Sequence, residues 1–283
     1  MILIADGGSS KVDWVLMSKD GVVLMKTRTK GLNPNVTSSD LLESRLANNV
    51  DILAVRNQVT EFYFYGAGCS EQRAIKEISE VFHSFFSNAK IEVKEDTYAA
   101  VYAVAKTPSI VCILGTGSNA CYFDGKSIDV RVPSLGYILM DEASGNYFGK
   151  KLIQDYFYHK MPVQERSAFE NMFEVTSGKI NENVYSKENP NRYLASFAPF
   201  LFGFKDSSYC QQLLYDGINK FFENKVLAFS ESKSVPIHFV GSIAYYASDT
   251  IKQVADSYSL ELGKTLQKPI EGLIRYHREK INS

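Results

Sequence analysis

Apolar residues in the first 30 positions form three runs separated by polar turns, a pattern typical of an antiparallel β-meander. The runs cover residues 2–5, 12–18 and 22–29. The first turn reads Asp6-Gly7-Gly8-Ser9-Ser10-Lys11, and the second reads Lys19-Asp20-Gly21. Asp-Gly supplies the positive φ angles of a type I′ turn, so we expect a tight hairpin at the second position.

The next part of the chain alternates between helical spacing and short buried runs. Helices are expected over 39–56, 70–87 and 97–106, the first capped by Ser39 or Asp40. Strands are expected over 61–65 and 91–95, the former followed by Gly66-Ala67-Gly68. This order of elements predicts a mixed sheet that begins with a meander and is flanked by helices.

The same order then begins again, which indicates an internal duplication. Residues 2–9 resemble 111–118, each an apolar strand followed by a glycine and hydroxyl turn. Residues 62–68 resemble 237–244, each a buried strand followed by a glycine turn. A period this long indicates duplicated domains, because a solenoid repeats every 20–50 residues.

The duplication predicts two α/β domains, residues 1–107 and 108–283, packed closely with a cleft between them. Residues 143–232 are apolar at helical spacing in several segments. We therefore expect a helical insertion in the second domain.

Composition narrows the functional classes. The 283 residues carry 31 Lys and Arg against 32 Asp and Glu, a net charge of −1. This balance argues against a sequence-independent nucleic-acid binder and against attraction to anionic membranes. No run approaches the roughly 20 apolar residues of a membrane-spanning helix, and the first residues lack the basic leader of a signal peptide. A cytoplasmic protein is expected, with four free cysteines in a reducing compartment because no C-x-x-C spacing occurs.

The two glycine turns are the strongest chemical signal. Each turn exposes backbone N–H groups, and glycine lets a phosphate approach the backbone closely. One such turn alone is weak, but a matched pair, one in each half, could hold the β- and γ-phosphates of ATP. The residues concerned are Gly7, Gly8, Ser9, Ser10, Gly115, Thr116 and Gly117.

Two charged residues flank the first turn. Asp6 could hold a Mg²⁺ ion that bridges the phosphates, through water, or it could cap its own turn. Lys11 could contact a phosphate oxygen or be solvated.

Asp96 follows the expected strand 91–95 and begins a helix. It is either an N-cap or a general base that accepts a proton from a substrate hydroxyl, because ligands bind at the carboxyl ends of strands in open α/β sheets. The adjacent Glu95 is expected to point the other way.

Other candidates are weaker. Asn35, in a Gly/Pro loop with Asn33, could form a turn or bind sugar hydroxyls. Gly241 and Ser242 could contact an adenosine or serve tight packing. Asp141 and Glu142 precede a helix and could be a cap whose charges interact favourably with the helix dipole. The four histidines form no catalytic or metal-binding spacing.

The ordered motifs resemble those of the N-acetylglucosamine kinases and the related BadF/BadG/BcrA/BcrD ATPases, within the sugar kinase/Hsp70/actin superfamily. They are Asp-Gly-Gly-Ser-Ser-Lys, Glu-Asp-Thr-Tyr-Ala-Ala, Leu-Gly-Thr-Gly-Ser-Asn, Gly-Tyr-Ile-Leu-Met-Asp-Glu-Ala-Ser-Gly and Val-Gly-Ser-Ile-Ala. The resemblance covers residues 2 to about 278 and implies two ribonuclease H-like domains, the actin-like ATPase fold.

The resemblance also implies a function, an ATP- and Mg²⁺-dependent sugar kinase that phosphorylates the 6-hydroxyl of N-acetylglucosamine or a similar sugar. Asp96 would be the base, and Gly241 and Ser242 would lie at the adenosine. The positions matching sugar contacts are Asn35, Ser118, Asn119, Gly136 and Asp141. Where the family often has Gly-Asp-Glu-Gly-Ser, this chain has Met140 and Ala143 in place of the glycines, so another sugar could be the acceptor.

A second class stays open, a regulatory or activator ATPase that acts on a partner protein. An electron-transferring activator needs cysteines for an iron–sulfur cluster shared across a dimer, and Cys112 and Cys121 flank the second turn. A packing role for both cysteines is the alternative. A homodimer is compatible with either function.

Overall fold

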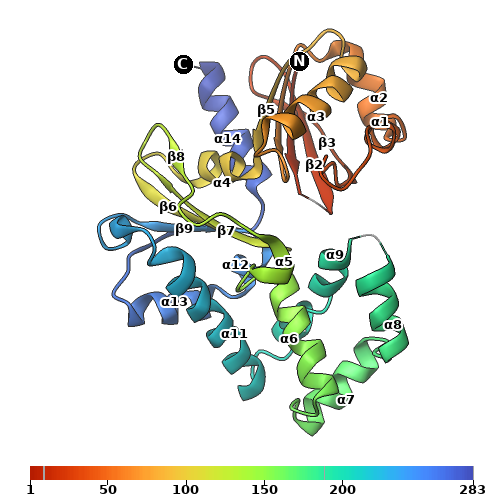
Figure 1. Ribbon diagram of the computed structural model, residues 1–283. Coiled ribbons are helices and arrows are strands. Elements are labelled where there is room, and N and C mark those ends of the chain that lie inside the picture. Colours follow the sequence, from red (N-terminus) through yellow and green to blue (C-terminus); the bar gives the residue numbers. More distant parts are fainter. Residues whose placement is uncertain (9, 188, 283) are drawn as a thin grey trace. The chain divides into compact units, whose positions relative to one another are not determined.

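The chain forms two compact units, shown in Figure 1, in a computed structural model that describes residues 1–8, 10–187 and 189–282. Unit 1 contains Met1–Ala103 with Lys268–Ser283, and unit 2 contains Val104–Gln267. The expected domains of 1–107 and 108–283 place the last helix in the second domain. In the structure that helix, α14 (Pro269–Asn282), contacts β1 and β2 of unit 1.

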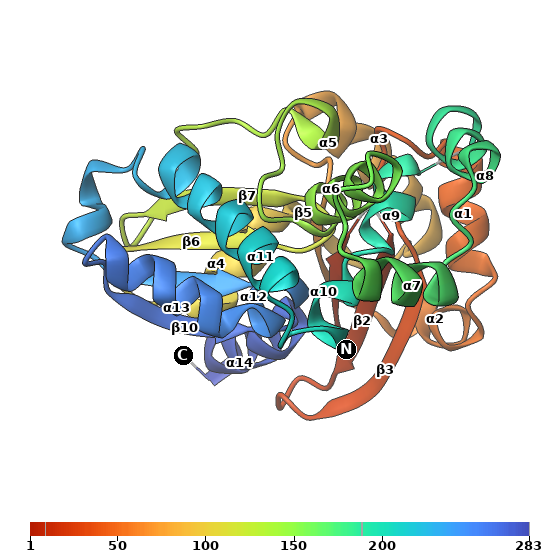
Figure 2. The same ribbon diagram turned by 90° about the horizontal axis from the view of Figure 1, so that it is seen from below.

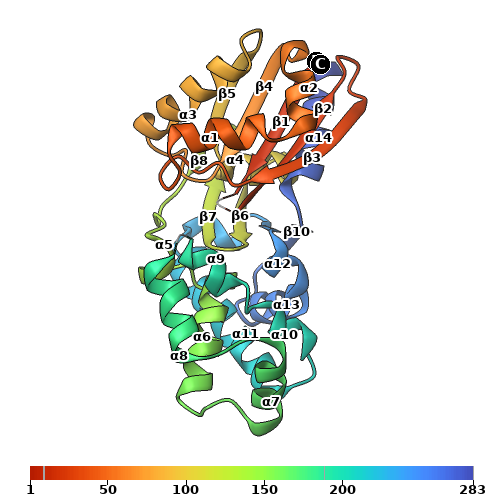
Figure 3. The ribbon, with the colours of Figure 1, turned by 90° about the vertical axis from the view of Figure 1, so that its right-hand side faces the viewer.

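Unit 1 is built on a five-stranded mixed sheet of order β3-β2-β1-β4-β5. Strands β1, β2 and β3 are antiparallel, which confirms the meander, and β1, β4 and β5 are parallel. The strands are β1 Ile2–Gly7, β2 Lys11–Met17, β3 Val23–Lys30, β4 Glu61–Gly66 and β5 Lys90–Glu95. Helices cover both faces, as Figure 3 shows, with α1 and α3 on one side and α14 on the other.

The apolar run of β1 is continuous because both faces of the sheet are buried there. Leu3 and Ala5 of β1 belong to one core with residues of α1, α2 and α3. Ile2 and Ile4 belong to the other, with residues of α4 and α14. These helices are α1 Ser39–Ala47, α2 Val50–Val55, α3 Gln72–Phe85 and α4 Asp96–Val104.

The prediction of one helix over 39–56 is wrong, because the chain breaks at Asn48 and Asn49 between α1 and α2. The Asn49 Oδ1 accepts a hydrogen bond from the Ile52 N–H at 3.0 Å and so caps α2. Its Nδ2 donates to the Arg28 carbonyl on β3 at 3.1 Å. One asparagine therefore begins a new helix and ties it to the sheet, which helical spacing alone does not reveal.

The turn between β2 and β3 is also different from the expected type I′ turn. Gly21 has φ +78°, whereas Asp20 is not in the left-handed region. The Gly21 N–H donates to the Ser18 carbonyl at 3.1 Å, and the Ser18 N–H to the Val22 carbonyl at 2.9 Å. This is a three-residue loop in which only the last residue needs a positive φ.

Unit 2 repeats the topology of unit 1, which confirms the duplication. Its five-stranded sheet has the order β10-β9-β6-β7-β8, so β6, β7, β8, β9 and β10 take the places of β1 to β5. The strands are β6 Ser109–Leu114, β7 Ser118–Phe123, β8 Ile128–Asp129, β9 Ile237–Val240 and β10 Leu262–Leu266. Strand β10 and helix α14 were not among the elements expected from the sequence.

Helices occupy most of 143–232, as expected, and Figure 2 shows several of them with the second sheet. They are α6 Gly145–Phe157, α7 Val163–Met172, α8 Ser177–Asn181, α9 Pro190–Ala195, α10 Pro199–Gly203 and α11 Ser208–Phe221. A short helix α5, Gly136–Leu139, precedes them, and α12 Ser242–Tyr246 and α13 Ser248–Ser257 follow β9. Helices α8 and α11 each continue into a π-helical turn, Glu182–Ser186 and Phe222–Val226.

Buried thiols and imidazoles serve packing in both units. All four cysteines are buried, and none forms a disulfide. The His238 Nδ1 accepts the Lys264 N–H at 2.7 Å, and the His277 Nε2 lies 2.9 Å from the Tyr65 hydroxyl oxygen. Within the described residues, no helix combines the length and the apolar character needed to cross a bilayer.

Candidate functional site

The carboxyl ends of three parallel strands in unit 1 bring two aspartates to one edge of the sheet. Gly7 of β1 pairs with Gly66 of β4, and Gly66 pairs with Glu95 of β5. Asp6 precedes Gly7 and Asp96 follows Glu95. A Cβ at Gly66 would lie 2.1 Å from the Phe64 ring, so packing demands glycine at this position.

Both carboxyl groups have raised pKa values. Burial, reinforced by the negative charges of Asp13 and Asp96, raises the pKa of Asp6 to about 7. Burial, reinforced by Glu95, raises the pKa of Asp96 to about 7 as well. A carboxylate with a pKa near the working pH is suited to general-base catalysis, because it both accepts and releases a proton there.

The Asp6 carboxylate has a hydrogen-bond donor on one side and a second carboxylate on the other. It accepts a hydrogen bond from the Ile270 N–H at the start of α14. Asp6 also lies opposite Asp13 in the β1–β2 pairing. Arg28 and Lys11 neutralise Asp13, with N–O distances of 2.7 and 3.3 Å. Lys11 is thus in an ion pair with Asp13 and about half exposed.

The first glycine turn has mixed properties. The Gly8 N–H donates to the Lys11 carbonyl at 2.9 Å, so it serves the hairpin itself. A Cβ at Gly7 would lie 2.7 Å from the Phe64 ring, so packing alone demands glycine there. The Ser10 Oγ is buried without a hydrogen-bond partner. A buried hydroxyl without a partner is uncommon, which makes Ser10 a candidate contact for a ligand. Ser9 lies outside the described residues.

The Asn33–Asn35 loop contacts the turn that follows β4. The Asn35 Nδ2 donates to the Gly68 carbonyl at 3.2 Å, and the Asn35 N–H donates to the Asn33 Oδ1 at 2.9 Å. Gly68 has φ +83°, and a Cβ there would lie 2.2 Å from the Asn33 Oδ1. Asn33 therefore forms the turn, and the Asn35 side chain ties the loop to Gly68, just after β4.

The second glycine turn, between β6 and β7, carries the start of helix α6. The Gly145 N–H donates to the Gly115 carbonyl at 2.8 Å, and the Asn146 N–H to the Thr116 carbonyl at 3.0 Å. The Ser118 Oγ is buried without a partner, as is the Ser10 Oγ of the first turn. The Asn119 Oδ1 accepts the Ala120 N–H at 2.9 Å.

Asp141 is the centre of a buried polar network beside this turn. Its Oδ1 accepts the Ser118 N–H at 3.2 Å, and its Oδ2 accepts the Asn146 Nδ2 at 2.8 Å. The Ser134 Oγ lies 3.5 Å from Oδ1. Because Asp141 is only 5% exposed, its first role is to hold the turn and α6 together.

Backbone strain surrounds this aspartate. Asp141 has φ +69° and Ala143 has φ +58°, which is left-handed backbone that side chains rarely adopt. Gly136, upstream, has φ +76°. Of the two positions that depart from the glycine-rich pattern, Ala143 is thus strained, whereas Met140 has φ −137°. A strained Ala143 fits a site where the surrounding contacts impose the conformation.

A pocket of about 340 Å³ opens in unit 2 next to the second turn. It is mainly apolar and lies within the usual size range of small-molecule sites. Thr116 and Ser242 contribute the side-chain hydroxyls, and Phe202 and Tyr246, with ring centroids 5.4 Å apart, contribute aromatic surface. The remaining lining residues are Gly115, Gly145, Ala195, Ala198, Pro199 and Ile243.

The structure thus brings Gly115, Thr116 and Ser242 to one pocket, whereas Asp6, Asp96 and Asn35 share an edge of unit 1. Sequence reasoning missed Asn146, Phe202 and Tyr246. Tyr246 follows the Gly241-Ser242 motif by one helical turn and could have been found from it. Phe202 lies in the helical insertion, and nothing in its local pattern indicates which face lines a pocket.

Gly241 separates β9 from α12 and packs against the second turn. It has φ +121°, and a Cβ there would lie 2.2 Å from the Leu114 carbonyl oxygen. Tight packing therefore explains this glycine, and it also allows Ser242 to reach the pocket.

We expect Gly241→Ala to lower the free energy of unfolding by about 2–3 kcal/mol, because both the φ angle and the clash oppose a side chain. Urea unfolding measures the change. Gly203→Ala is the matched control, since a Cβ at Gly203 meets no atom within 4 Å. Equal stability of the two variants would contradict the packing described here.

Comparisons with known proteins agree with this fold. No protein-family model matches the chain, and no curated protein sequence matches it. Among solved structures, a "putative N-acetylglucosamine kinase" from Porphyromonas gingivalis is 36% identical with a TM-score of 0.92, over 99% of each chain. One of the same description from Chromobacterium violaceum is 16% identical with a TM-score of 0.74, over 97% of this chain and 98% of that one.

A glucokinase of the ROK family from Streptomyces griseus, solved with glucose and AMPPNP, shares the fold. It is 10% identical with a TM-score of 0.66, over 97% of each chain. The two duplicated sheets thus define the actin-like ATPase fold. At 36% identity over its length, the chain belongs to the family of the Porphyromonas protein, the sugar kinases of that superfamily. It is therefore a phosphotransferase.

Proposed function

We propose that this sugar kinase transfers the γ-phosphoryl group of ATP to the 6-hydroxyl of N-acetylglucosamine or a similar amino sugar, as a member of the BadF/BadG/BcrA/BcrD ATPase family. The observation that carries the proposal is Asp96, a carboxyl group with a pKa of about 7 at the carboxyl edge of a parallel sheet. The identity to the Porphyromonas protein supports the acceptor class.

In this proposal Asp96 removes the proton of the sugar hydroxyl as its oxygen attacks the γ-phosphorus. Asn35 contacts the sugar from unit 1. In unit 2 the sugar contacts are Ser118, Asn119, Gly136 and Asp141. Ser118 has the stronger support among these four, because its buried Oγ has no partner in the protein.

ATP would occupy the pocket of unit 2, with its base against Phe202 and Tyr246 and beside Gly241 and Ser242. The phosphates would meet the glycine turns, at Gly7, Gly8, Ser9, Ser10 and Lys11 in unit 1 and at Gly115, Thr116 and Gly117 in unit 2. The buried Ser10 Oγ supports the first of these contacts. The solved complex of the related fold with AMPPNP supports the nucleotide class.

Mg²⁺ would lie beside Asp6, held through water. The described residues contain no set of three His, Cys, Asp or Glu placed to hold a metal directly. A single carboxylate, that of Asp6, fits Mg²⁺. This ion keeps several waters and binds through one or two carboxylates and the phosphates of the substrate. When bound, the ion neutralises charge on the phosphate oxygens. A cation beside Asp6 would also reduce the repulsion between its negative charge and those of Asp13 and Asp96.

The electron-transferring version of the activator alternative requires accessible cysteine thiolates. Cys112 and Cys121 are 0% and 1% exposed, on the neighbouring strands β6 and β7. Burial raises the pKa of Cys112 well above its ordinary value, which disfavours the thiolate that ligates iron. No observation therefore favours electron transfer over phosphorylation.

An ATP-consumption screen over amino sugars, hexoses and no acceptor tests the proposal. We expect consumption that depends on an added sugar, with N-acetylglucosamine among the best acceptors, because a sugar kinase uses its acceptor to complete the site. Mass spectrometry of the product locates the phosphate. Hydrolysis at the same rate without any acceptor would contradict the proposal and favour a regulatory ATPase.

A further inference from the structure

Lys225 is a buried lysine on the π-helical turn that follows α11. Its side chain is 2% exposed. The ammonium donates to two successive backbone carbonyls, Val132 at 3.1 Å and Pro133 at 3.3 Å. Burial lowers the pKa of Lys225, and the carboxylates of Glu142 and Asp141 act in the opposite direction. A charge buried in this way costs free energy, so its contacts need an explanation.

Val132 and Pro133 begin a segment that two further side chains hold by hydrogen bonds. We name residues 132–142 the acceptor segment. Lys150 of α6 donates to the Tyr137 carbonyl in its middle at 3.0 Å. Asn224, next to Lys225, donates to the Glu142 Oε1 at its end at 3.2 Å. The segment is therefore held at its start, middle and end by side chains of the helical insertion.

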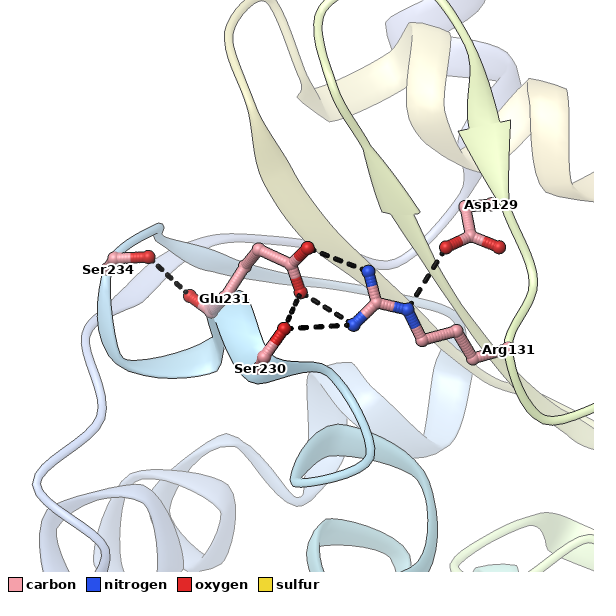
Figure 4. A network of polar contacts seen from close by, with 5 residues as sticks. All are labelled: Asp129, Arg131, Ser230, Glu231 and Ser234. Carbon is pink, nitrogen blue, oxygen red and sulfur yellow. Dashed lines mark hydrogen bonds and ion pairs between the residues drawn. The ribbon is translucent and has the colours of Figure 1, made fainter.

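An ion pair fixes the chain just before the acceptor segment, as Figure 4 shows. Both terminal nitrogens of Arg131 lie 2.7 Å from the Glu231 carboxylate oxygens, and the Arg131 Nε lies 3.0 Å from Asp129. The guanidinium also lies over the Phe229 ring, 5.1 Å from its centroid. A bidentate pair of this kind fixes geometry as well as adding energy.

The acceptor segment has little apolar burial of its own. Leu135, Ile138 and Leu139 are 56%, 72% and 71% exposed. Its only helix, α5, spans four residues, and Gly136 and Asp141 have positive φ angles. Its conformation therefore depends on the polar anchors more than on a core, and Lys225 is the most deeply buried of them.

We propose that Lys225 is a positioning residue for the sugar, because it fixes the acceptor segment and with it Ser134, Gly136 and Asp141. The inference rests on the proposed function, in which Gly136 and Asp141 contact the acceptor. The effect of Lys225 passes through the backbone at 132–133 to Gly136 and Asp141, the sugar contacts proposed in this segment.

Lys225→Met tests this, because it keeps an unbranched apolar chain and removes the N–H donors. We expect the KM for the sugar to rise about tenfold or more, since small misplacements of a binding group cost that much. The KM for ATP should stay within about twofold. Hydrogen exchange followed by mass spectrometry should become faster at 132–142 and remain unchanged in β6. Lys220→Met is the matched control, an exposed lysine of the same helix.

The two KM values test the role of Lys225, and sugar phosphorylation by the wild-type protein tests the proposed function. An unchanged sugar KM with unchanged exchange at 132–142 would overturn the inference, as would an equal rise in both KM values with faster exchange throughout unit 2. If Lys225→Met does not fold, Lys150→Met removes the contact to Tyr137 and must show the same split between the two KM values. If the wild-type protein phosphorylates no sugar, the proposed function fails, and exchange at 132–142 still decides whether Lys225 holds the segment.

Discussion

Asp96→Asn should abolish phosphoryl transfer while leaving nucleotide binding nearly intact. The amide has the shape of the carboxyl group but cannot accept the proton of the sugar hydroxyl, so we expect kcat to fall by about 10²–10⁴-fold. The dissociation constant of ATP, measured by calorimetry, should change little. Its pocket lies in unit 2, whereas Asp96 belongs to unit 1.

Glu95→Gln is the matched control, because it removes the neighbouring carboxylate and keeps Asp96. The Glu95 Oε2 already accepts the Thr97 hydroxyl at 3.0 Å, which gives it a local structural partner. We expect this variant to keep most of its activity. Unchanged turnover in Asp96→Asn would refute the assignment of the base.

The raised pKa of Asp96 adds two pH effects. Activity of the wild-type protein should rise with pH through about 7, as the carboxyl group loses its proton. The folded-state pKa lies above the unfolded value of 3.8. The buried carboxylate therefore destabilises the folded state progressively as pH rises from about 4 to 7. Asp96→Asn removes this charge, so its Tm should exceed that of the wild type at pH 8 and match it near pH 4.

Ser242→Trp should weaken ATP binding by about 100-fold. Ser242 lines the pocket of unit 2 from the start of α12, and an indole there takes up much of the space proposed for the base. Because Ser242 is exposed and begins a helix, the larger side chain should leave the fold intact. Fluorescence titration with a nucleotide analogue gives the affinity, and circular dichroism checks the fold.

Two comparisons decide how this result is interpreted. Tyr245→Trp adds bulk on the same helix at an exposed position that does not line the pocket, so ATP binding should be unchanged. Ser242→Ala should also bind ATP nearly normally, since the small size of the residue matters more than its hydroxyl. Normal ATP affinity in Ser242→Trp would place the nucleotide elsewhere.

The sequence predicted best those features that depend on neighbouring residues. The meander, the second glycine turn and the position of Asp96 after β5 follow from short apolar runs and turn residues, and the structure contains them. The break at Asn49 was missed, although its cap on Ile52 is local, because Asn49 also bonds to β3, more than 20 residues away. The packing role of Gly241 was open for the same reason, since the atom it would strike is the Leu114 carbonyl.

The sequence by itself determined the two duplicated halves, the glycine turns and the aspartates at the strand ends, because each is encoded in a few consecutive residues. Only the tertiary structure decided that α14 belongs to unit 1, that Phe202 and Tyr246 line a pocket with Thr116, and that Lys225 holds the acceptor segment. These contacts join residues about 45 to 270 positions apart, and each is formed only when buried apolar faces have folded together. Local patterns record which residues are buried, but not which distant residues they meet.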